Sequence, residues 1–485
     1  MKRRNQAGFP ALSTSYPEED TRTGCHRRAG GSGNCAGLLR PCSENESVVA
    51  QVNRSSGATW SKWSRYNTFV PRQDGGAYLF NGRTGALVGL AAYRRAQIEN
   101  DELLDDDFYA LLSQQGFIVK NNVDEVSLVL GAHEKARGSR DSFSATIELT
   151  EACNFRCLYC YQDHPGKHLG NEAQRRILLY LARKMREVPH VHVNWFGGEP
   201  LLRFNTLRTL SERLTREAAG ADCRLTQFLT SNGYLLTPDL ATELARLGIG
   251  NVQITLDGSR ATHDRLRPLA SGRSTYDRVL EACVNVVRVG IELMVRVNVN
   301  RVNAETVGSL LDDLLEAGVT PKCAVIHAVR TIDHGTCAAG MADACFTNAQ
   351  FARVWIDILR EVAQRGFGLP SLAPIACNCP FDLQQTVMIG RDGSIRHCSS
   401  SDGLLARLDG DGTESEHTPL FDRIKSRRPD DDPACRACSY LPMCMGGCAY
   451  LREIGQEPCN PERYVLGELV ALSAPITGFL QTHQT

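Results

Sequence analysis

The fold of this chain is decided by the stretch Glu151-Ala152-Cys153-Asn154-Phe155-Arg156-Cys157-Leu158-Tyr159-Cys160-Tyr161, which follows directly on a strand-like segment at 145–150. Apolar and polar residues alternate in this segment, which predicts a strand, so the cysteines stand in a loop at its carboxyl end. Three thiolates in a C-x3-C-x2-C spacing can hold three irons of a [4Fe–4S] cube and leave the fourth iron without a protein ligand. A structural zinc site, the alternative for such a loop, normally takes four protein ligands. The spacing therefore favours an iron–sulfur centre.

Strand-like and helix-like segments alternate after this loop, up to about residue 329. Such alternation is typical of an α/β fold with a parallel sheet, and it predicts a partial (β/α)6 TIM-like barrel. In barrels of this kind the chemistry gathers at the carboxyl ends of the strands. The expected strands are 145–150, 191–196, 226–230, 251–257, 293–300 and 322–327, and the expected helices are 173–186, 204–218, 238–247, 276–289 and 304–317.

The later strands carry small and polar residues that are candidates for ligand binding. Taken alone, the glycine pair and the turn residues among them indicate only tight bends. The guanidinium of Arg296 stands in an otherwise apolar strand, and burying it unpaired would be costly, so a carboxylate partner is expected, either in a salt bridge or in a bound ligand. The candidates are Gly197, Gly198, Glu199, Pro200, Ser231, Asn232, Gln253, Asp257 and Arg296.

The cysteine stretch, with Tyr159 just before its third cysteine, resembles the signature of the radical S-adenosylmethionine (SAM) superfamily. The resemblance implies that Cys153, Cys157 and Cys160 hold a catalytic [4Fe–4S] cluster whose open iron chelates the amino and carboxylate groups of SAM. One electron then cleaves SAM to a 5′-deoxyadenosyl radical. The resemblance also implies a cofactor-binding role for Tyr159 and for the candidates named above.

The resemblance gives a more specific role to one motif and one serine among those candidates. Gly197-Gly198-Glu199-Pro200 is similar to a GGEP motif that contacts the SAM amino group, in which Glu199 accepts hydrogen bonds from the ammonium. Ser231 is expected near the SAM carboxylate or ribose, although a plain strand-ending turn explains its position nearly as well.

A second group of cysteines follows near the C-terminus, in an order that resembles a SPASM domain. The resemblance implies two auxiliary [4Fe–4S] clusters, and therefore three clusters in all. One would be held by Cys435, Cys438, Cys444 and Cys459, and the other by Cys379, Cys398 and Cys448. Cys377 either completes the second set or leaves one iron open to substrate. A zinc ribbon is the alternative, but it uses two C-x2-C pairs and only one such pair is present here.

Four segments are expected along the chain. Residues 1–60 are rich in Gly, Ser, Asn and Arg and are interpreted as a disordered extension, with Cys25, Cys35 and Cys42 as free thiols. Residues 61–140 are expected to be a small α+β module that resembles winged-helix peptide-recognition elements. Residues 141–345 would form the barrel and residues 346–485 the Cys-rich domain with a C-terminal helix, where metal coordination supplies folding free energy.

Composition excludes several classes of function. The 54 basic and 55 acidic residues nearly cancel, so no broad field exists to attract nucleic acid or anionic lipid. No run of eighteen apolar residues occurs, and the first residues lack the apolar core of a signal peptide. We therefore expect a cytoplasmic protein without membrane or nucleic-acid partners, in which the clustered members of its 19 cysteines bind metal rather than form disulfides.

The resemblance implies a radical SAM oxidoreductase that modifies a ribosomally made peptide by forming a thioether or carbon–carbon crosslink. The 61–140 module would hold a leader peptide by strand addition, and ferredoxin or flavodoxin would supply low-potential electrons. A formylglycine-forming sulfatase maturase ranks second, because that branch has Asp where Ser399 follows Cys398. A non-catalytic iron–sulfur electron-transfer scaffold is the alternative from another class, and it predicts clusters without SAM cleavage.

Overall fold

The computed structural model of the protein describes residues 61–335, 341–379, 382–401, 403–477 and 480–481. The interpretation of residues 1–60 and of their three cysteines lies outside this described part. Within it, no helix is long and apolar enough to cross a lipid bilayer.

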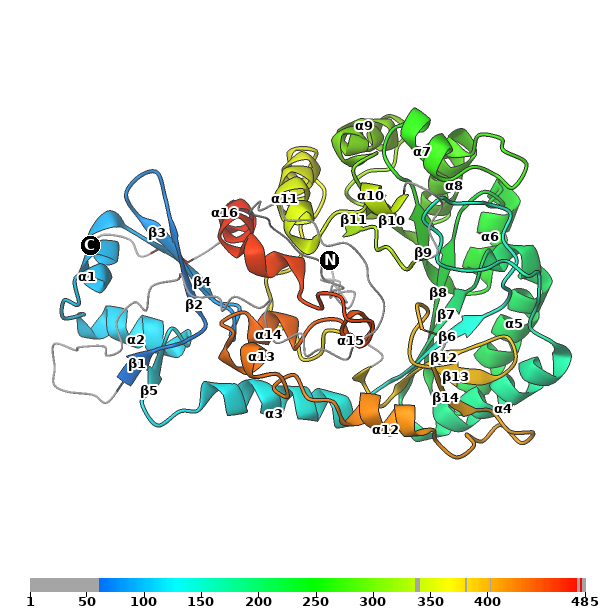
Figure 1. Ribbon diagram of the computed structural model, residues 1–485, viewed down its shortest axis with the longest axis horizontal. Coiled ribbons are helices and arrows are strands. Elements are labelled where there is room, and N and C mark those ends of the chain that lie inside the picture. Colours follow the sequence, from blue (N-terminus) through cyan, green and yellow to red (C-terminus); the bar gives the residue numbers. More distant parts are fainter. Residues whose placement is uncertain (1–60, 336–340, 380–381, 402, 478–479, 482–485) are drawn as a thin grey trace, which may run out of the picture.

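A nine-stranded sheet forms the body of the molecule, with strand order β11-β10-β9-β8-β7-β6-β12-β13-β14. Its six consecutive parallel strands confirm the strands expected from the sequence, and the helices between them lie along one side of the sheet (Figure 1). These strands are β6 (Phe143–Glu148), β7 (His190–Phe196), β8 (Arg224–Ser231), β9 (Ile249–Thr255), β10 (Glu292–Val299) and β11 (Ala324–Arg330).

The helices of this region are amphipathic, which is why they pack on the sheet. In α4 (Asn171–Glu187), for example, Ala173, Ile177, Tyr180 and Leu181 form one buried stripe. The other helices are η1 (Pro200–Arg203), α5 (Phe204–Gly220), α6 (Pro238–Arg246), α7 (Arg260–Leu266), α8 (Tyr276–Arg288), η2 (Ala304–Thr306), α9 (Val307–Glu316), α10 (Met341–Ala344) and α11 (Asn348–Gln364). The expected α/β architecture with a mostly parallel sheet is confirmed.

Three strands from the Cys-rich region extend this sheet. These strands were not predicted from the sequence. β12 (Thr386–Ile389) pairs in parallel with β6, and β13 (Ser394–Arg396) and β14 (Leu404–Arg407) follow as antiparallel neighbours. The apolar residues of β12 are all buried. Because β13 runs antiparallel to β12 and β6, the chain that leaves β13 toward Cys398 heads for the amino end of β6. The side chain of the next residue, Ser399, hydrogen-bonds Tyr161, which follows Cys160 in the cysteine loop.

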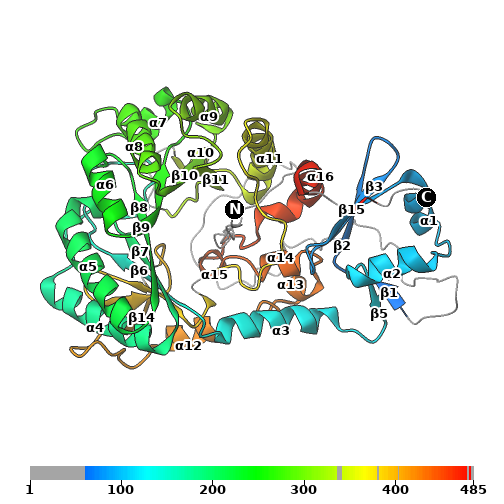
Figure 2. The ribbon, with the colours of Figure 1, turned by 180° about the vertical axis from the view of Figure 1, so that it is seen from behind.

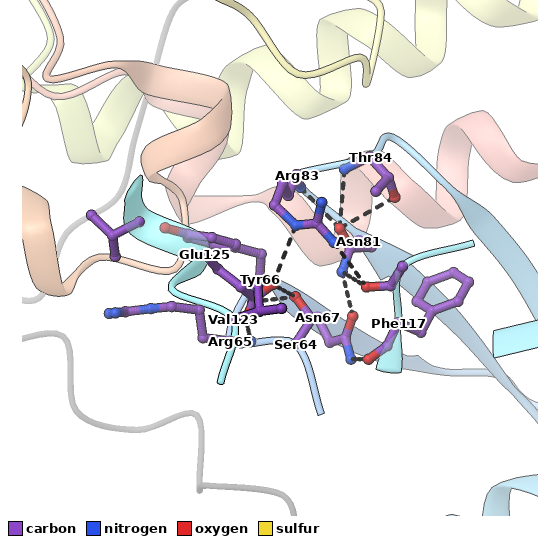
Figure 3. Close-up of polar contacts among 12 residues, drawn as sticks. Ser64, Arg65, Tyr66, Asn67, Asn81, Arg83, Thr84, Phe117, Val123 and Glu125 are labelled. Atoms are coloured by element: carbon purple, nitrogen blue, oxygen red, sulfur yellow. Dashed lines mark hydrogen bonds and ion pairs between the residues drawn. The ribbon is translucent and has the colours of Figure 1, made fainter. Parts of the chain in front are cut away.

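The N-terminal module contains a sheet of order β15-β4-β3-β2 and a separate pair of β1 with β5. A buried carboxylate, Glu125, joins its parts: it accepts hydrogen bonds from Ser64 Oγ at 2.5 Å and from Arg83 Nε at 3.2 Å (Figure 3). The elements are β1 (Ser61–Trp63), β2 (Asn67–Pro71), β3 (Ala77–Asn81), β4 (Leu87–Leu90), α1 (Ala92–Glu99), α2 (Asp106–Gln114), β5 (Ile118–Lys120), α3 (Glu125–Gly138) and β15 (Leu480–Gln481).

The remaining helices of the Cys-rich region lie between the module and the nine-stranded sheet (Figures 1 and 2). Side chains of the module and of these helices share two small apolar clusters, so the two parts pack on each other directly. The helices are α12 (Pro419–Ser426), α13 (Pro433–Ala437), α14 (Leu441–Cys444), α15 (Ala449–Glu453), η4 (Pro461–Tyr464) and α16 (Leu466–Thr477).

Candidate iron–sulfur and cofactor site

The loop that carries Cys153, Cys157 and Cys160 is fixed by backbone hydrogen bonds to the segment after α7. The N–H groups of Arg156 and Leu158 donate to the carbonyls of Pro268 and Leu266, both at 2.9 Å. Because these bonds flank the second cysteine on both sides, the loop has one defined conformation at the carboxyl end of β6.

The three thiols of this loop form one electrostatic group. Burial raises the pKa of Cys153 to about 11 and that of Cys157 to about 12. Burial also raises the pKa of Cys160, but hydrogen bonding with His164, whose Nε2 lies 3.6 Å from the sulfur, gives a net lowering. The charges of the neighbouring thiols contribute to the raised pKa of Cys157. The structure therefore brings together the three sulfurs that the sequence predicted to act jointly.

A buried guanidinium, that of Arg267, lies beside the three thiols and lowers the pKa of each. Its side chain is 8% exposed, and its Nε has no hydrogen-bond partner among the described residues. A buried cation with an unpaired N–H next to three thiols suits an anionic group that the thiolates would hold. The donor set thus fits an iron–sulfur cluster. Across the described residues, no group of three or more His, Cys, Asp or Glu side chains is arranged to bind a single metal ion.

Tyr159 is the centre of a buried hydrogen-bond network that reaches three strand ends. Its hydroxyl donates to Asp257 and accepts from Arg267 Nη1 at 2.5 Å and from Asn298 Nδ2 at 3.1 Å. Asp257 also accepts from the backbone N–H of Asn298 at 2.7 Å and lies 3.7 Å from Arg267. Tyr159 and Asp257, which the sequence suggested as cofactor contacts, therefore also contact each other.

Arg296 lies on the same side of β10 as this network. Its Nε donates to Oδ1 of Asn298 at 2.9 Å, an amide where a carboxylate was expected. Burial lowers its pKa, while Asp257, Tyr159 and Tyr161 raise it. The negative charge of Asp257 thus acts on Arg296 from a distance. Among the described residues Arg296 forms no direct salt bridge, which was one of the two alternatives that the sequence left open.

The two glycines after β7 are required by close packing on the cysteine loop. A Cβ atom on Gly197 would lie 2.3 Å from the carbonyl oxygen of Thr150, and one on Gly198 would lie 2.4 Å from that of Ala152. Gly197 also has a φ of +142°, which favours glycine. The N–H of Gly198 donates to the Thr150 carbonyl at 2.8 Å, and that of Glu199 to the Ala152 carbonyl at 2.9 Å. The glycine turn and the cysteine loop are therefore one rigid unit.

Glu199 joins the ends of β7 and β8. Its fully buried carboxylate accepts hydrogen bonds from the N–H of Leu201 at 2.9 Å, from Ser231 Oγ at 2.9 Å and from the N–H of Asn232 at 2.7 Å. Burial raises its pKa to about 7. The Glu199 carboxylate thus already accepts three hydrogen bonds from protein groups. The resemblance implied that it accepts hydrogen bonds from the ammonium group of a ligand. Pro200 begins η1 immediately after it.

The remaining candidates lie on the neighbouring strands. Asn232 Nδ2 donates to Asn154 Oδ1 at 2.7 Å and lies 3.9 Å from Cys153 Sγ, so the end of β8 contacts the cysteine loop directly. Gln253 lies in the middle of β9, level with Thr230 of β8 and Met294 of β10.

The C-terminal cysteines gather in two groups. Burial raises the pKa of Cys444 to about 12, with contributions from the charges of Cys459, Cys438 and Cys435. These four thiols, which the resemblance grouped as one ligand set, therefore lie close together. For Cys398, burial raises the pKa to about 11, with a further contribution from Cys448.

Cys377 belongs to the surroundings of the second group. Its Sγ donates to the carbonyl of Cys379 at 3.0 Å. Burial raises its pKa to about 12, with a contribution from the negative charge of Asp382, which also raises the pKa of Cys448. Both Cys377 and Cys379 also act on Lys425. Cys377 therefore lies beside Cys379 and within reach of the same charges as Cys448.

Three residues at the first site were not among the sequence candidates: Arg267, His164 and Asn298. Arg267 ends the charged stretch 263–267, which comes shortly after the strand expected at 251–257, and this position was a usable signal. His164 follows Cys160 by four residues, a spacing that could have indicated a contact with its sulfur. The role of Asn298 depends on the alignment of β10 with β9, for which the sequence holds no local signal.

Comparison with known proteins places this geometry among characterised folds. The sequence model described as "Radical SAM superfamily" matches residues 147–314. Mycofactocin maturase MftC of Mycolicibacterium smegmatis is 26% identical over 331 residues, which are 64% of this chain and 79% of that protein. GTP 3′,8-cyclase of Xanthomonas campestris pv. campestris is 30% identical over 279 residues, which are 52% of this chain and 77% of the cyclase. Native anSMEcpe, solved with AdoMet and the Cp18Cys peptide, shares the fold, with a TM-score of 0.53 and 17% identity over 69% of this chain and 97% of that one.

Proposed function

This chain belongs to the radical SAM superfamily and is an enzyme, and from that premise we propose that it is a maturase that oxidatively modifies a ribosomally made peptide. The product would carry a thioether or carbon–carbon crosslink. The observation that supports the SAM-dependent step is the joining of the cysteine loop, the glycine turn and the buried Arg267 into one unit. A relative named as a maturase and a fold neighbour solved with AdoMet and a peptide support the peptide substrate.

Cys153, Cys157 and Cys160 would hold the first [4Fe–4S] cluster, which when bound supplies the electron and the open coordination site for SAM cleavage. The chain's own residues position the reactants. Glu199 fixes the turn that would face the SAM amino group, and Arg267 places a positive charge beside the thiolates. The remaining proposed cofactor contacts are Tyr159, Gly197, Gly198, Pro200, Ser231, Asn232, Gln253, Asp257 and Arg296.

Two auxiliary [4Fe–4S] clusters complete the proposal. Cys435, Cys438, Cys444 and Cys459 would hold one, and their mutual effect on pKa supports this set. Cys379, Cys398 and Cys448 would hold the other. We add Cys377 to this second set because of its contact with Cys379. These clusters would accept the electron that leaves when a substrate radical becomes product, and a low-potential donor such as ferredoxin or flavodoxin would reduce the first cluster.

We assign leader-peptide binding to residues 61–140, SAM chemistry to 141–345 and the auxiliary clusters to 346–485. Direct contacts between the first and last of these segments support a shared task. Arg65 Nη2 donates to the carbonyls of Arg436 and Ala437, at 3.4 and 2.9 Å, within the loop between Cys435 and Cys438. A cavity of about 600 Å³ adjoins this contact and is lined by Lys62, Trp63 and the 121–126 turn.

Sulfatase maturation is the second candidate, because anSMEcpe shares the fold. The residue after Cys398 argues against it: Ser399 stands where that branch has an aspartate base, and its side chain hydrogen-bonds Tyr161 instead. A scaffold that only transfers electrons would need neither the glycine turn nor the hydrogen-bonded end of β8.

The experiment that tests the proposal begins with the purified protein, reconstituted anaerobically with iron and sulfide. With dithionite and SAM, we expect 5′-deoxyadenosine by chromatography from the unaltered chain and none from Cys157→Ala. Cys323→Ala is the matched control and should retain the activity, because the Cys323 thiol hydrogen-bonds Thr320 within its own turn, away from the cysteine loop. Intact clusters without 5′-deoxyadenosine would refute SAM cleavage.

The substrate part of the proposal needs its own experiment. Co-expression with the peptide encoded by a neighbouring short reading frame should give a product whose mass is lower by two hydrogens for each crosslink. An unmodified peptide, together with formylglycine in a co-expressed sulfatase, would support the second candidate instead.

A further inference from the structure

Two arginines donate hydrogen bonds to sulfurs of the Cys435–Cys459 group. Arg463 Nη1 lies 2.9 Å from Cys459 Sγ, and Arg452 Nη2 lies 3.5 Å from Cys435 Sγ. Both arginines come from the segment between Cys448 and the C-terminal helix, which none of the motifs in the sequence singled out. The two sulfurs belong to the same predicted set of four ligands.

Arg452 is held in place by groups other than sulfur. Its Nη1 donates to Asp432 Oδ2 at 2.8 Å, and its Nη2 also donates to the carbonyl of Gly446 at 3.1 Å. Its buried Nε has no hydrogen-bond partner in the described part of the chain. An unpaired, buried N–H on a cation that is already oriented toward a ligand sulfur suits an anionic cluster beside it.

Hydrogen bonds to cluster sulfurs change the reduction potential for an electrostatic reason. Uptake of one electron increases the negative charge on the cluster and on its ligand sulfurs. A cationic donor interacts more favourably with the reduced form than with the oxidised form, so the potential becomes more positive. Arginine cannot lose its proton in a protein, so this effect is permanent.

We propose that Arg463 and Arg452 are positioning residues that raise the reduction potential of the auxiliary cluster held by Cys435, Cys438, Cys444 and Cys459, which makes this cluster an electron acceptor. The proposal rests on the proposed function, because it requires that cluster. Reduction of this auxiliary cluster adds one electron to it and neither forms nor breaks a covalent bond.

The test is a redox titration of the holoenzyme with dithionite, followed by electron paramagnetic resonance. We expect Arg463→Gln to move the midpoint potential of one cluster in the negative direction, and Arg452→Gln with Arg463→Gln to move it further. Arg463→Lys retains the charge and a donor, so it should give a smaller shift. The iron content of each variant is measured alongside.

Arg436→Gln is the matched control. Arg436 lies in the loop between Cys435 and Cys438, so its replacement removes the same charge close to the cluster. Its side chain is 52% exposed, and its Nη1 donates to Asp430 at 2.9 Å rather than to a sulfur. We expect the midpoint potentials of this variant to match those of the unaltered protein.

Each outcome has a distinct meaning. Unchanged midpoints in Arg463→Gln with full iron content would overturn the inference, as would an equal shift in Arg436→Gln. If the glutamine variants lose iron, the inference is tested with Arg463→Lys, provided that this variant has full iron. A negative shift of its midpoint potential supports the inference, and an unchanged midpoint potential overturns it. Failure of the proposed function looks different, because it shows in the unaltered protein: either the iron of this cluster is missing, or the clusters are intact and no 5′-deoxyadenosine is formed.

Discussion

At the scale of single residues, the first site depends on backbone packing as much as on its cysteines. Gly198 lies so close to the carbonyls of Ala152 and Glu151 that a Cβ atom would be 2.4 and 2.7 Å from them. Both obstacles are backbone atoms of the loop that leads to Cys153, so they cannot rotate away as a side chain could. Any side chain at this position must displace the cysteine loop.

We therefore expect Gly198→Ala to lower the free energy of unfolding by about 1–3 kcal/mol, because of overpacking, and to lower the iron retained at the first site. Gly220→Ala is the matched control: a Cβ there meets nothing within 4 Å, at the end of α5. It should leave iron content unchanged. Thermal unfolding and iron determination check both. Equal iron content in the two variants would show that the loop tolerates the displacement.

At the scale of elements, β6 and β13 are joined by a buried ion pair. Arg396 Nη2 lies 2.7 Å from Glu148 Oε2, and their side chains are 17% and 6% exposed. Burial raises the pKa of Glu148, and Arg396 opposes that rise. The pair thus connects the first strand of the barrel to the strand that precedes Cys398, and it stabilises the arrangement of the two cysteine-bearing ends.

We expect Arg396→Leu to lower the free energy of unfolding by about 3 kcal/mol, because it leaves a buried carboxylate without its partner. In this variant the pKa of Glu148 rises further above its unfolded value. Stability from a raised carboxyl pKa is present at low pH and is lost as pH rises through the folded pKa. The deficit of the variant should therefore widen as pH increases, as measured by urea unfolding at several pH values.

The single variant Glu148→Leu and the double variant Glu148→Leu/Arg396→Leu complete the cycle. The double variant removes both charges and should recover most of the lost stability. Additive losses in the double variant would mean that the two side chains do not depend on each other.

The elements also show what sequence can and cannot predict. The six parallel strands were predictable because each has a local apolar pattern. The loop with Cys153 was predictable because its ligands lie within eight residues. β12 was missed, because its four residues, three of them apolar, were read as part of a Cys-rich region and its partner, β6, lies more than 200 residues earlier. The carboxylate partner expected for Arg296 stays a prediction, since the hydrogen bond of its Nε goes to Asn298, two residues further along the same strand.

At the scale of the whole molecule, the N-terminal module is part of the core of the Cys-rich region. Tyr66, Val126, Val129 and Leu130 share an apolar cluster with Leu441 and Met445, against which Cys435 packs. A second cluster joins Val70 and Phe80 to Met443 and Cys444. The module thus buries the apolar side chains that surround two of the proposed cluster ligands, a task that the short helices of a Cys-rich segment cannot perform alone.

Helix α3 carries two leucines, one buried in this packing and one exposed, and they allow the packing to be tested. Leu130 is 6% exposed in the shared cluster, whereas Leu128 is 53% exposed. Leu130→Asp would bury an unpaired charge at a cost of several kcal/mol, which is about the folding free energy of a small domain. We therefore expect this variant to lose the iron of the auxiliary cluster proposed at Cys435 and Cys444. Leu128→Asp should change nothing. The loss is measured as iron and sulfide per chain. Both variants should still form 5′-deoxyadenosine, which would show that the nine-stranded sheet and its cysteine loop are folded. Full iron in Leu130→Asp would mean that the Cys-rich region folds without help from the module.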